Sequence, residues 1–235
     1  MKSIDHGILL KKINYSETSL ILHFFTLEKG FQAYLFQGGK KKKGNILQPL
    51  SIVEINAYQR PDSELGKISS ISPDFIPQSI PYHPLKSGLA FFMTEVLEQA
   101  LRSSDEDARM YNMIDQEIQW LDDTDAITNY PIWFLLRLAD QLGFAIQKLE
   151  KDGRIFDLQA GTISNQTPDG HAFENDDAVI ELRDLLSYTK TELLAQSIHK
   201  IHRQQIVEHL ISYYRWHIEG FKHPKSLHVM QTIFN

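Results

Sequence analysis

Five short segments in which polar and apolar residues alternate occupy the first 75 residues, and they constrain the fold more than any other feature. The segments cover residues 6–14, 20–27, 31–37, 50–58 and 66–71, with turn formers such as Gly30 and Gly38-Gly39 between them. Alternation with a period of two is typical of strands that bury one face. Five such strands joined by short turns predict a small, closed β-barrel.

Beyond residue 81 the spacing of apolar residues changes to three and four, which predicts helices. The expected helices cover residues 84–102, 107–121, 131–142, 178–187, 199–219 and 224–234. Between the third and fourth lies Lys148 to Asn175, a stretch rich in turn formers whose short alternations predict a small hairpin. We therefore expect an α+β protein with a five-stranded barrel at residues 1–80 and a mostly helical domain at 81–235 that carries this insert.

Four consecutive lysines, Lys40, Lys41, Lys42 and Lys43, follow the third expected strand and stand between glycines. Adjacent ammonium groups repel one another, and the phosphates of a nucleic acid would relieve that repulsion. The run therefore indicates a polyanion as partner. A solubilising surface loop is the alternative explanation of such a run.

The charge of the chain is divided unevenly along its length. Residues 1–80 carry ten Lys and Arg against seven Asp and Glu, whereas residues 81–235 carry 14 against 23. The first part thus has a net charge of +3 and the second of −9, within a total of −6. A basic module joined to an acidic one indicates separate partners.

A barrel of five strands that carries a lysine loop fits the OB-fold, in which cations follow the phosphates and aromatic rings stack on bases. We expect Phe31 and Leu35 to face inward, which leaves Tyr34 and Phe36 on the outer face. A role in the barrel core is the alternative for each ring. The expected DNA contacts are Lys11, Lys12, Lys29, Tyr34, Phe36, Lys40, Lys41, Lys42, Lys43, Tyr58 and Arg60.

Catalytic and metal sites find little support in the sequence. The chain has no cysteine, which excludes disulfides, thiolate metal sites and cysteine nucleophiles. Neither a Gly-x-Ser-x-Gly motif nor a phosphate-binding P-loop occurs, so a hydrolase is not expected. Six histidines crowd the last quarter without a tight His/Glu spacing, and we interpret them as residues of amphipathic helices: His199, His202, His209, His217, His223 and His228.

Several strings of residues resemble the DNA repair and recombination mediator family RecO. At the N-terminus these are Gly7–Lys11, Tyr15–Leu22, Phe25–Gly30, the Gly38–Lys41 loop and Leu47–Leu50. Near the end, Tyr214–Phe221 and Pro224–Leu227 are similar to the closing helices of that family. The resemblance implies an OB-fold followed by a helical domain with a zinc knuckle, in a protein without a catalytic site.

The family resemblance also implies partners. These are single- and double-stranded DNA, the mediator RecR, the acidic tail of single-strand binding protein and, indirectly, the recombinase RecA. An acidic, hydrophobic-ended peptide would need a cation beside an apolar helix face. The cations that could serve are Arg102, Arg137, Lys148 and Arg154.

The expected zinc knuckle departs from the family pattern, because family members hold zinc with four cysteines. The matching stretch here, Lys148 to Asn175, offers His171 and no cysteine. Structural zinc requires four strong ligands, so we expect no metal and no other cofactor. Apolar side chains should hold the insert instead, namely Ile155, Phe156, Leu158, Ile163 and Phe173.

Two functions remain open at this point. The first is a non-enzymatic mediator that binds DNA, promotes annealing of complementary strands and helps to load a recombinase. The second is an adaptor that binds only proteins and uses the lysine run for solubility. Because the sequence has neither an apolar stretch of about 20 residues nor an apolar signal core, we expect a cytoplasmic protein. We also expect it to associate with the nucleoid.

Overall fold

The computed structural model describes residues 2–39, 46–60, 63–102 and 104–233. The chain forms two compact units. The first extends to Thr124 and also includes Pro224–Ile233, and the second is Asp125–His223. The closing helix of the sequence is therefore part of the N-terminal unit.

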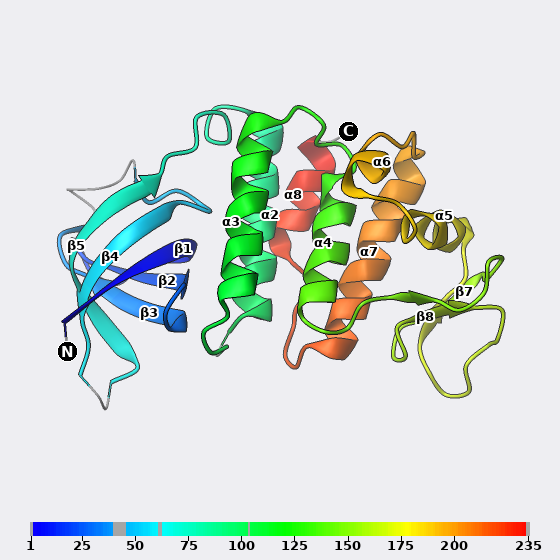
Figure 1. The fold of residues 1–235 in the computed structure, drawn as a ribbon, viewed down its shortest axis with the longest axis horizontal. Coiled ribbons are helices and arrows are strands. Elements are labelled where there is room, and N and C mark those ends of the chain that lie inside the picture. The colour runs from blue at the N-terminus through cyan, green and yellow to red at the C-terminus, as the bar shows by residue number, and fades with distance from the viewer. Residues whose placement is uncertain (1, 40–45, 61–62, 103, 234–235) are drawn as a thin grey trace. The chain divides into compact units, whose positions relative to one another are not determined.

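A closed barrel of five strands forms the start of the first unit (Figure 1). The strand order around the barrel is β1-β2-β3-β5-β4, and all neighbours are antiparallel except β3 and β5. β1 pairs with β4 through Lys2–Ile8 and with β2 through Gly7–Asn14. Its register with β2 shifts between Leu9 and Lys11. The strands are β1 (Lys2–Asn14), β2 (Leu20–Thr26), β3 (Gly30–Phe36), β4 (Ile52–Tyr58) and β5 (Leu65–Phe75).

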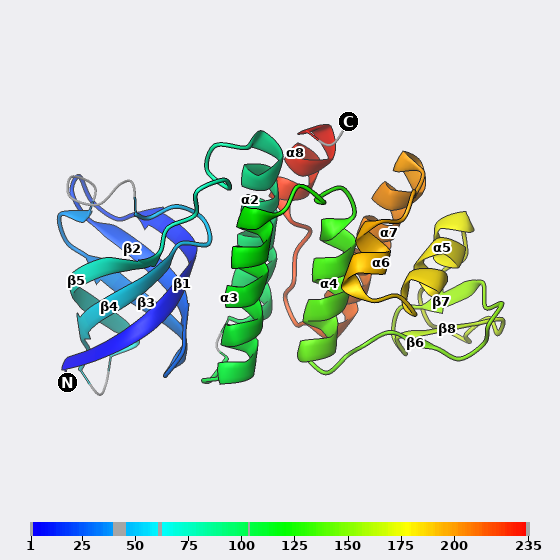
Figure 2. The same ribbon diagram turned by 45° about the horizontal axis from the view of Figure 1, so that its top comes forward.

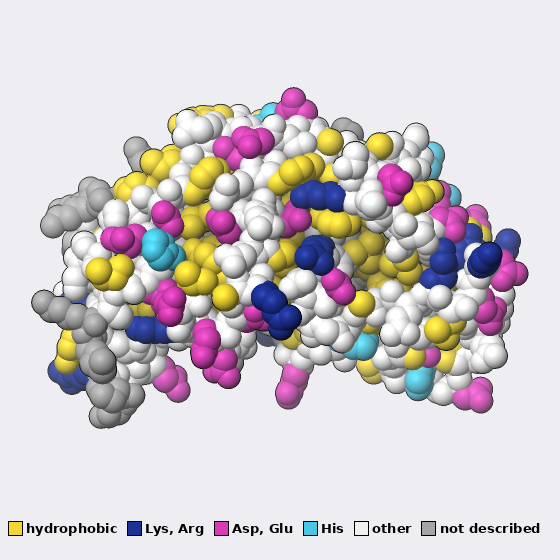
Figure 3. All heavy atoms as spheres, viewed as in Figure 1, with side chains coloured by type: hydrophobic (Ala, Val, Ile, Leu, Met, Phe, Trp, Pro, Cys, Tyr) yellow, Lys and Arg dark blue, Asp and Glu magenta, His cyan; other side chains and the backbone are white. Residues whose placement is uncertain are grey.

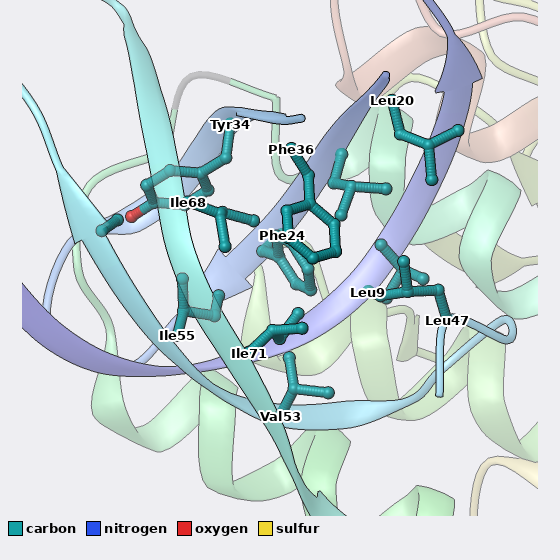
Figure 4. Close-up of a cluster of buried hydrophobic side chains, with 12 residues drawn as sticks. Leu9, Leu20, Phe24, Tyr34, Phe36, Leu47, Val53, Ile55, Ile68 and Ile71 are labelled. Atoms are coloured by element: carbon teal, nitrogen blue, oxygen red, sulfur yellow. The ribbon is translucent and has the colours of Figure 1, made fainter. Parts of the chain in front are cut away.

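The barrel interior is filled by side chains from all five strands. Leu22, Phe24 and Val53 are completely buried there, and Tyr34 and Phe36 join them from β3 (Figure 4). Burying a side chain of this size stabilises the fold by about 1.5–3 kcal/mol. The barrel interior is thus a packed hydrophobic core.

The described part of the first unit also contains the helices α2 (Pro84–Ala100), α3 (Ala108–Asp123) and α8 (Lys225–Ile233). Pro84 lies in the first turn of α2, where its missing N–H costs nothing. Asp107 caps α3 by accepting hydrogen bonds from two backbone N–H groups. The Glu95 carboxylate on α2 accepts hydrogen bonds from the N–H groups of Lys225 and Ser226, both at 2.9 Å, which anchors α8 to α2.

The second unit combines helices with a small sheet (Figure 2). Its helices are α4 (Tyr130–Gln141), α5 (Asp177–Leu185), α6 (Lys190–Leu194) and α7 (Lys200–His217). The sheet has the order β6-β8-β7-β9, with β6 (Gln147–Lys148), β7 (Ile155–Asp157), β8 (Thr162–Ser164) and β9 (Phe173–Glu174). α7 packs against α4, and its buried Tyr214 donates a hydrogen bond to the Leu135 carbonyl at 2.7 Å.

The α+β architecture predicted from the sequence is confirmed, including the five-stranded barrel. The insert forms the small sheet, and Phe156 and Ile163 are completely buried in it, whereas Phe173 is 36% exposed. Helix α6 was not predicted from the sequence. Among the described residues, no helix has the length and apolar character that crossing a membrane requires.

Candidate nucleic-acid interface

The lysine run lies in the connection between β3 and β4, and Lys40 to Lys43 fall outside the described residues. The glycines that precede the run have defined roles. Gly38 adopts a φ of +72°, which L side chains rarely adopt, and a Cβ on Gly39 would lie 2.6 Å from the Phe36 ring. Glycine is therefore favoured at both positions, at Gly38 by the backbone conformation and at Gly39 by the close Phe36 ring.

Tyr34 and Phe36 do not face outward, so the predicted orientation of β3 was wrong. Their side chains are 1% and 6% exposed in the barrel core, while Phe31 and Leu35 lie on the half-buried outer side. Burial raises the pKa of Tyr34 to about 12, with a further contribution from the Asp5 carboxylate. In this conformation neither ring can stack on a base (Figure 4).

Lys11 is exposed on β1 but is paired with the buried Glu98 carboxylate of α2. Glu98 Oε1 also contacts His23 Nδ1 at 3.4 Å and Arg102 Nη2 at 2.6 Å. Burial raises the pKa of Glu98, but hydrogen bonds from His23 and Arg102 and the charges of Lys11 and Arg102 outweigh it and lower the pKa to about 2. Lys11 and Arg102 are therefore already neutralised in part within the fold.

Lys12 and Lys29 each donate one hydrogen bond within the barrel. Lys12 Nζ reaches the Leu47 carbonyl at 3.0 Å, and Lys29 Nζ reaches Ser3 Oγ at 2.8 Å. An ammonium group has three donors, and neither contact neutralises its charge. Both side chains can therefore still contact a phosphate.

Tyr58 is the last residue of β4 and Arg60 follows the strand, and both are exposed as a surface contact requires. Tyr58 is 46% exposed and lies opposite Lys67 of β5 in the strand register. Lys67 is an exposed cation that was not among the predicted DNA contacts. Its position beside Tyr58 follows from the pairing of β4 with β5, which one sequence does not reveal.

On the face shown in Figure 3, the Lys and Arg side chains of the described residues are scattered among Asp and Glu and do not form a continuous patch. Of the four cations considered for a peptide partner, Arg102 belongs to the first unit and the other three to the second. Arg137 pairs with Asp140 at 2.9 Å, Lys148 donates to Ser187 Oγ at 2.7 Å, and Arg154 is exposed. The structure thus does not gather these four in one unit.

The histidines of the second unit contact carboxylates or backbone groups, and His209 contacts two carboxylates, those of Asp176 at 2.9 Å and Glu174 at 3.6 Å. His171 Nδ1 lies 2.8 Å from Asp157 Oδ2, and His202 Nδ1 lies 2.6 Å from Glu181 Oε1. Burial raises the pKa of Asp157, but hydrogen bonds from the Ala160 N–H and from His171 outweigh it and lower the pKa. Among the described residues, no group of three or more His, Cys, Asp or Glu side chains is arranged to hold a metal ion.

Comparison with known proteins gives matches along nearly the whole chain. Residues 1–73 match the family model for the recombination protein O N terminal, and residues 82–227 match the model for its C terminal. The chain is 29% identical over 233 residues to the DNA repair protein RecO of Christiangramia forsetii, with 97% of each chain covered.

Two further relatives carry the same name. Identity is 28% over 234 residues to the protein of Flavobacterium psychrophilum and 30% over 237 residues to that of Azobacteroides pseudotrichonymphae. In both cases 97% of this chain and 98% of the relative are covered. The matches therefore include the barrel, the helices and the insert.

Proposed function

This chain belongs to the recombination protein O family of DNA repair proteins, and from this premise we propose that it is a non-enzymatic mediator that binds DNA. It binds single and double strands, promotes annealing of complementary strands and helps a partner of the RecR type to load a recombinase. We place the DNA contacts on the barrel module, residues 1–80, and the protein contacts on residues 81–235. The protein acts in the cytoplasm, on the nucleoid.

One observation carries the proposal: four consecutive lysines occur in the connection between β3 and β4 of a closed barrel, in a chain whose net charge is −6. Lysines that neutralise phosphates release condensed counterions, and this release drives binding irrespective of sequence. A basic site on an acidic protein confines the nucleic acid to one region. The lysine run thus supplies affinity, and the acidic remainder disfavours other sites.

Annealing of complementary DNA strands requires no chemical step. Two strands held on one basic surface repel each other less and have a higher effective concentration. Besides the lysine run, we propose Lys12, Lys29 and Arg60 as phosphate contacts and Tyr58 as a base contact. Lys67 is added because it lies opposite Tyr58. Lys11 contributes less, because Glu98 already pairs with it.

The protein partners are proposed from the family relationship alone. We propose that a RecR-type protein and the acidic tail of single-strand binding protein bind this chain, the tail through one of Arg102, Arg137, Lys148 and Arg154. Charge reversal at each position should identify the cation, because the correct one would reduce peptide binding while the other three would not. If all four variants bind the peptide as the wild type does, this peptide site is wrong.

Binding of labelled single- and double-stranded oligonucleotides at several salt concentrations tests the proposed function. A mediator should bind both, with an affinity that falls steeply as the salt concentration rises. It should also accelerate annealing of complementary strands at low salt. A protein that binds neither oligonucleotide at low salt would instead be an adaptor for other proteins.

A further inference from the structure

A groove of about 620 Å³ opens within the first unit, beside the end of β5 and the first half of α2. This volume falls in the range typical of ligand pockets. Prolines and aromatic residues dominate its lining, which includes Pro49, Phe75, Pro77, Pro81, Tyr82 and Phe91. The groove lies outside the packed barrel core, and none of the DNA contacts considered above lines it.

Large apolar side chains on the groove are exposed to solvent. Tyr82 is 84% exposed, Phe91 57% and Ile76 56%. Single exposed apolar residues are common, but three on one groove indicate an interaction site. Two of the three are aromatic, so the groove displays flat ring surfaces as well as apolar area.

A network of hydrogen bonds holds the groove wall in place. The Asp122 carboxylate accepts from the backbone N–H groups of Gln78, Ser79 and Ile80 at 2.7, 2.7 and 2.8 Å. Ser87 Oγ donates to the Ile80 carbonyl at 2.6 Å. The segment that precedes Tyr82 is therefore fixed before any ligand binds, which lowers the entropic cost of binding.

The described residues of the groove lining carry no charged side chain, so the lining does not repel an anionic ligand. No carboxylate belongs to its lining, and the carboxylates near it in sequence are engaged: Asp74 with His6 at 2.7 Å, and Glu95 with the N–H groups at the start of α8. Ile46, which lines the groove, follows the lysine run by three residues in the sequence. An apolar, carboxylate-free groove next in sequence to four lysines complements a ligand with flat apolar faces and phosphates.

We infer that this groove stacks unpaired bases of single-stranded nucleic acid on Tyr82 and Phe91. The inference rests on the proposed function and adds a site to it. Stacking on aromatic side chains tolerates any base, because every base has a π-face. It also supplies the base contacts that Tyr34 and Phe36, buried in the barrel core, cannot make. A duplex keeps its bases stacked on one another, so this groove discriminates between single and double strands.

The test compares wild type with the double variant Tyr82→Ala, Phe91→Ala on three oligonucleotides: single-stranded, single-stranded with abasic sites, and duplex. Both side chains are more than half exposed, so the fold should persist, which circular dichroism would check. Trp216→Ala, at an aromatic side chain of α7 that is 53% exposed, is the matched control. We expect the double variant to bind the normal single strand roughly tenfold or more weakly. Binding of the abasic strand and the duplex, and the salt dependence, should not change.

The possible outcomes distinguish a failure of the groove inference from a failure of the proposed function. Wild type that binds no oligonucleotide at low salt would contradict DNA binding altogether. If wild type binds and the double variant binds the normal strand equally well, the groove is not a base site, although DNA binding stands. An equal loss on all three oligonucleotides would also overturn the inference. So would an apolar peptide that binds wild type but not the variant while strand binding is unchanged, because the groove would then belong to a protein partner.

Discussion

The Lys11 ammonium on the barrel lies 3.3 Å from the Glu98 carboxylate on α2, and Glu98 is only 4% exposed. Because Glu98 is buried, its negative charge is stabilised by the cations that contact it and not by water. Glu98 therefore has a structural role, in which it joins the first strand of the barrel to the first long helix. For the same reason, Lys11 is a weaker phosphate contact than its exposure suggests.

Replacing Glu98 by Gln should destabilise the protein at neutral pH but much less in acid. The pKa of Glu98 is lowered from 4.5 to about 2, so its stabilising effect is present above pH 4.5 and is lost as the pH falls toward 2. At pH 7 the effect is on the order of 3 kcal/mol. Urea unfolding at pH 7 and at pH 3 measures it, with the exposed Glu64→Gln as control. An equal difference from wild type at both pH values would contradict the role of this ion pair.

Tyr34→Ala should reduce stability, whereas Tyr58→Ala should reduce DNA binding. Tyr34 is buried in the barrel core, so its truncation should lower the free energy of unfolding by about 3–5 kcal/mol. Tyr58 is 46% exposed, so Tyr58→Ala should change stability by less than about 0.5 kcal/mol while weakening single-strand binding. Chemical unfolding and oligonucleotide titration of the two variants would show this. A stable Tyr34→Ala variant would mean that the ring does not occupy the core.

The case of β3 shows what the sequence could and could not predict. Alternation located the strand, but both of its faces are apolar, so the pattern alone did not tell which face is inward. The neighbours decide this: Phe24 of β2 packs edge-on against Tyr34 inside the barrel, and His23 packs against Phe31 outside. Such contacts depend on which strands pair, and the alternation of residues within one strand does not determine its partners.

Helix α6 was not predicted, although the sequence contains a recognisable signal for its start. Thr189 and Glu192 form a capping box, with reciprocal hydrogen bonds between side chains and backbone. The pattern of Thr followed three residues later by Glu indicates a helix start. The groove beside α2, in contrast, could not be predicted, because it brings together residues from three separate parts of the sequence.

Asp122→Ala should destabilise the first unit strongly. The substitution leaves the N–H groups of Gln78, Ser79 and Ile80 without their acceptor, and it affects Lys86, whose buried ammonium lies between Ser79 Oγ and the Asp122 carbonyl. Hydrogen bonds to a charged group contribute about 1.5–3 kcal/mol each, so we expect a loss of roughly 3 kcal/mol or more. Thermal unfolding measures the loss, and the exposed neighbour Asp123→Ala is the control. Equal melting temperatures for both variants would refute this role of Asp122.

The insert should depend on packing and not on zinc. Phe156 is completely buried and contacts Tyr213 of α7 at a ring distance of 5.3 Å, so Phe156→Ala should cost about 3–5 kcal/mol. Phe173→Ala, at a ring that is 36% exposed, should cost much less. A chelator such as EDTA should leave the melting temperature unchanged. Stoichiometric zinc in the purified protein, with a lower melting temperature after its removal, would contradict this account.

The central claim is that the lysine run binds nucleic-acid phosphates, and the salt dependence of single-strand binding tests it most directly. The measurement compares wild type with the variant in which Lys40, Lys41, Lys42 and Lys43 are all alanine. We predict weaker binding at low salt and a flatter dependence of log K on log salt concentration, by roughly 0.7 for each phosphate contact that is lost. Equal affinity and equal slope for the two proteins would contradict the claim.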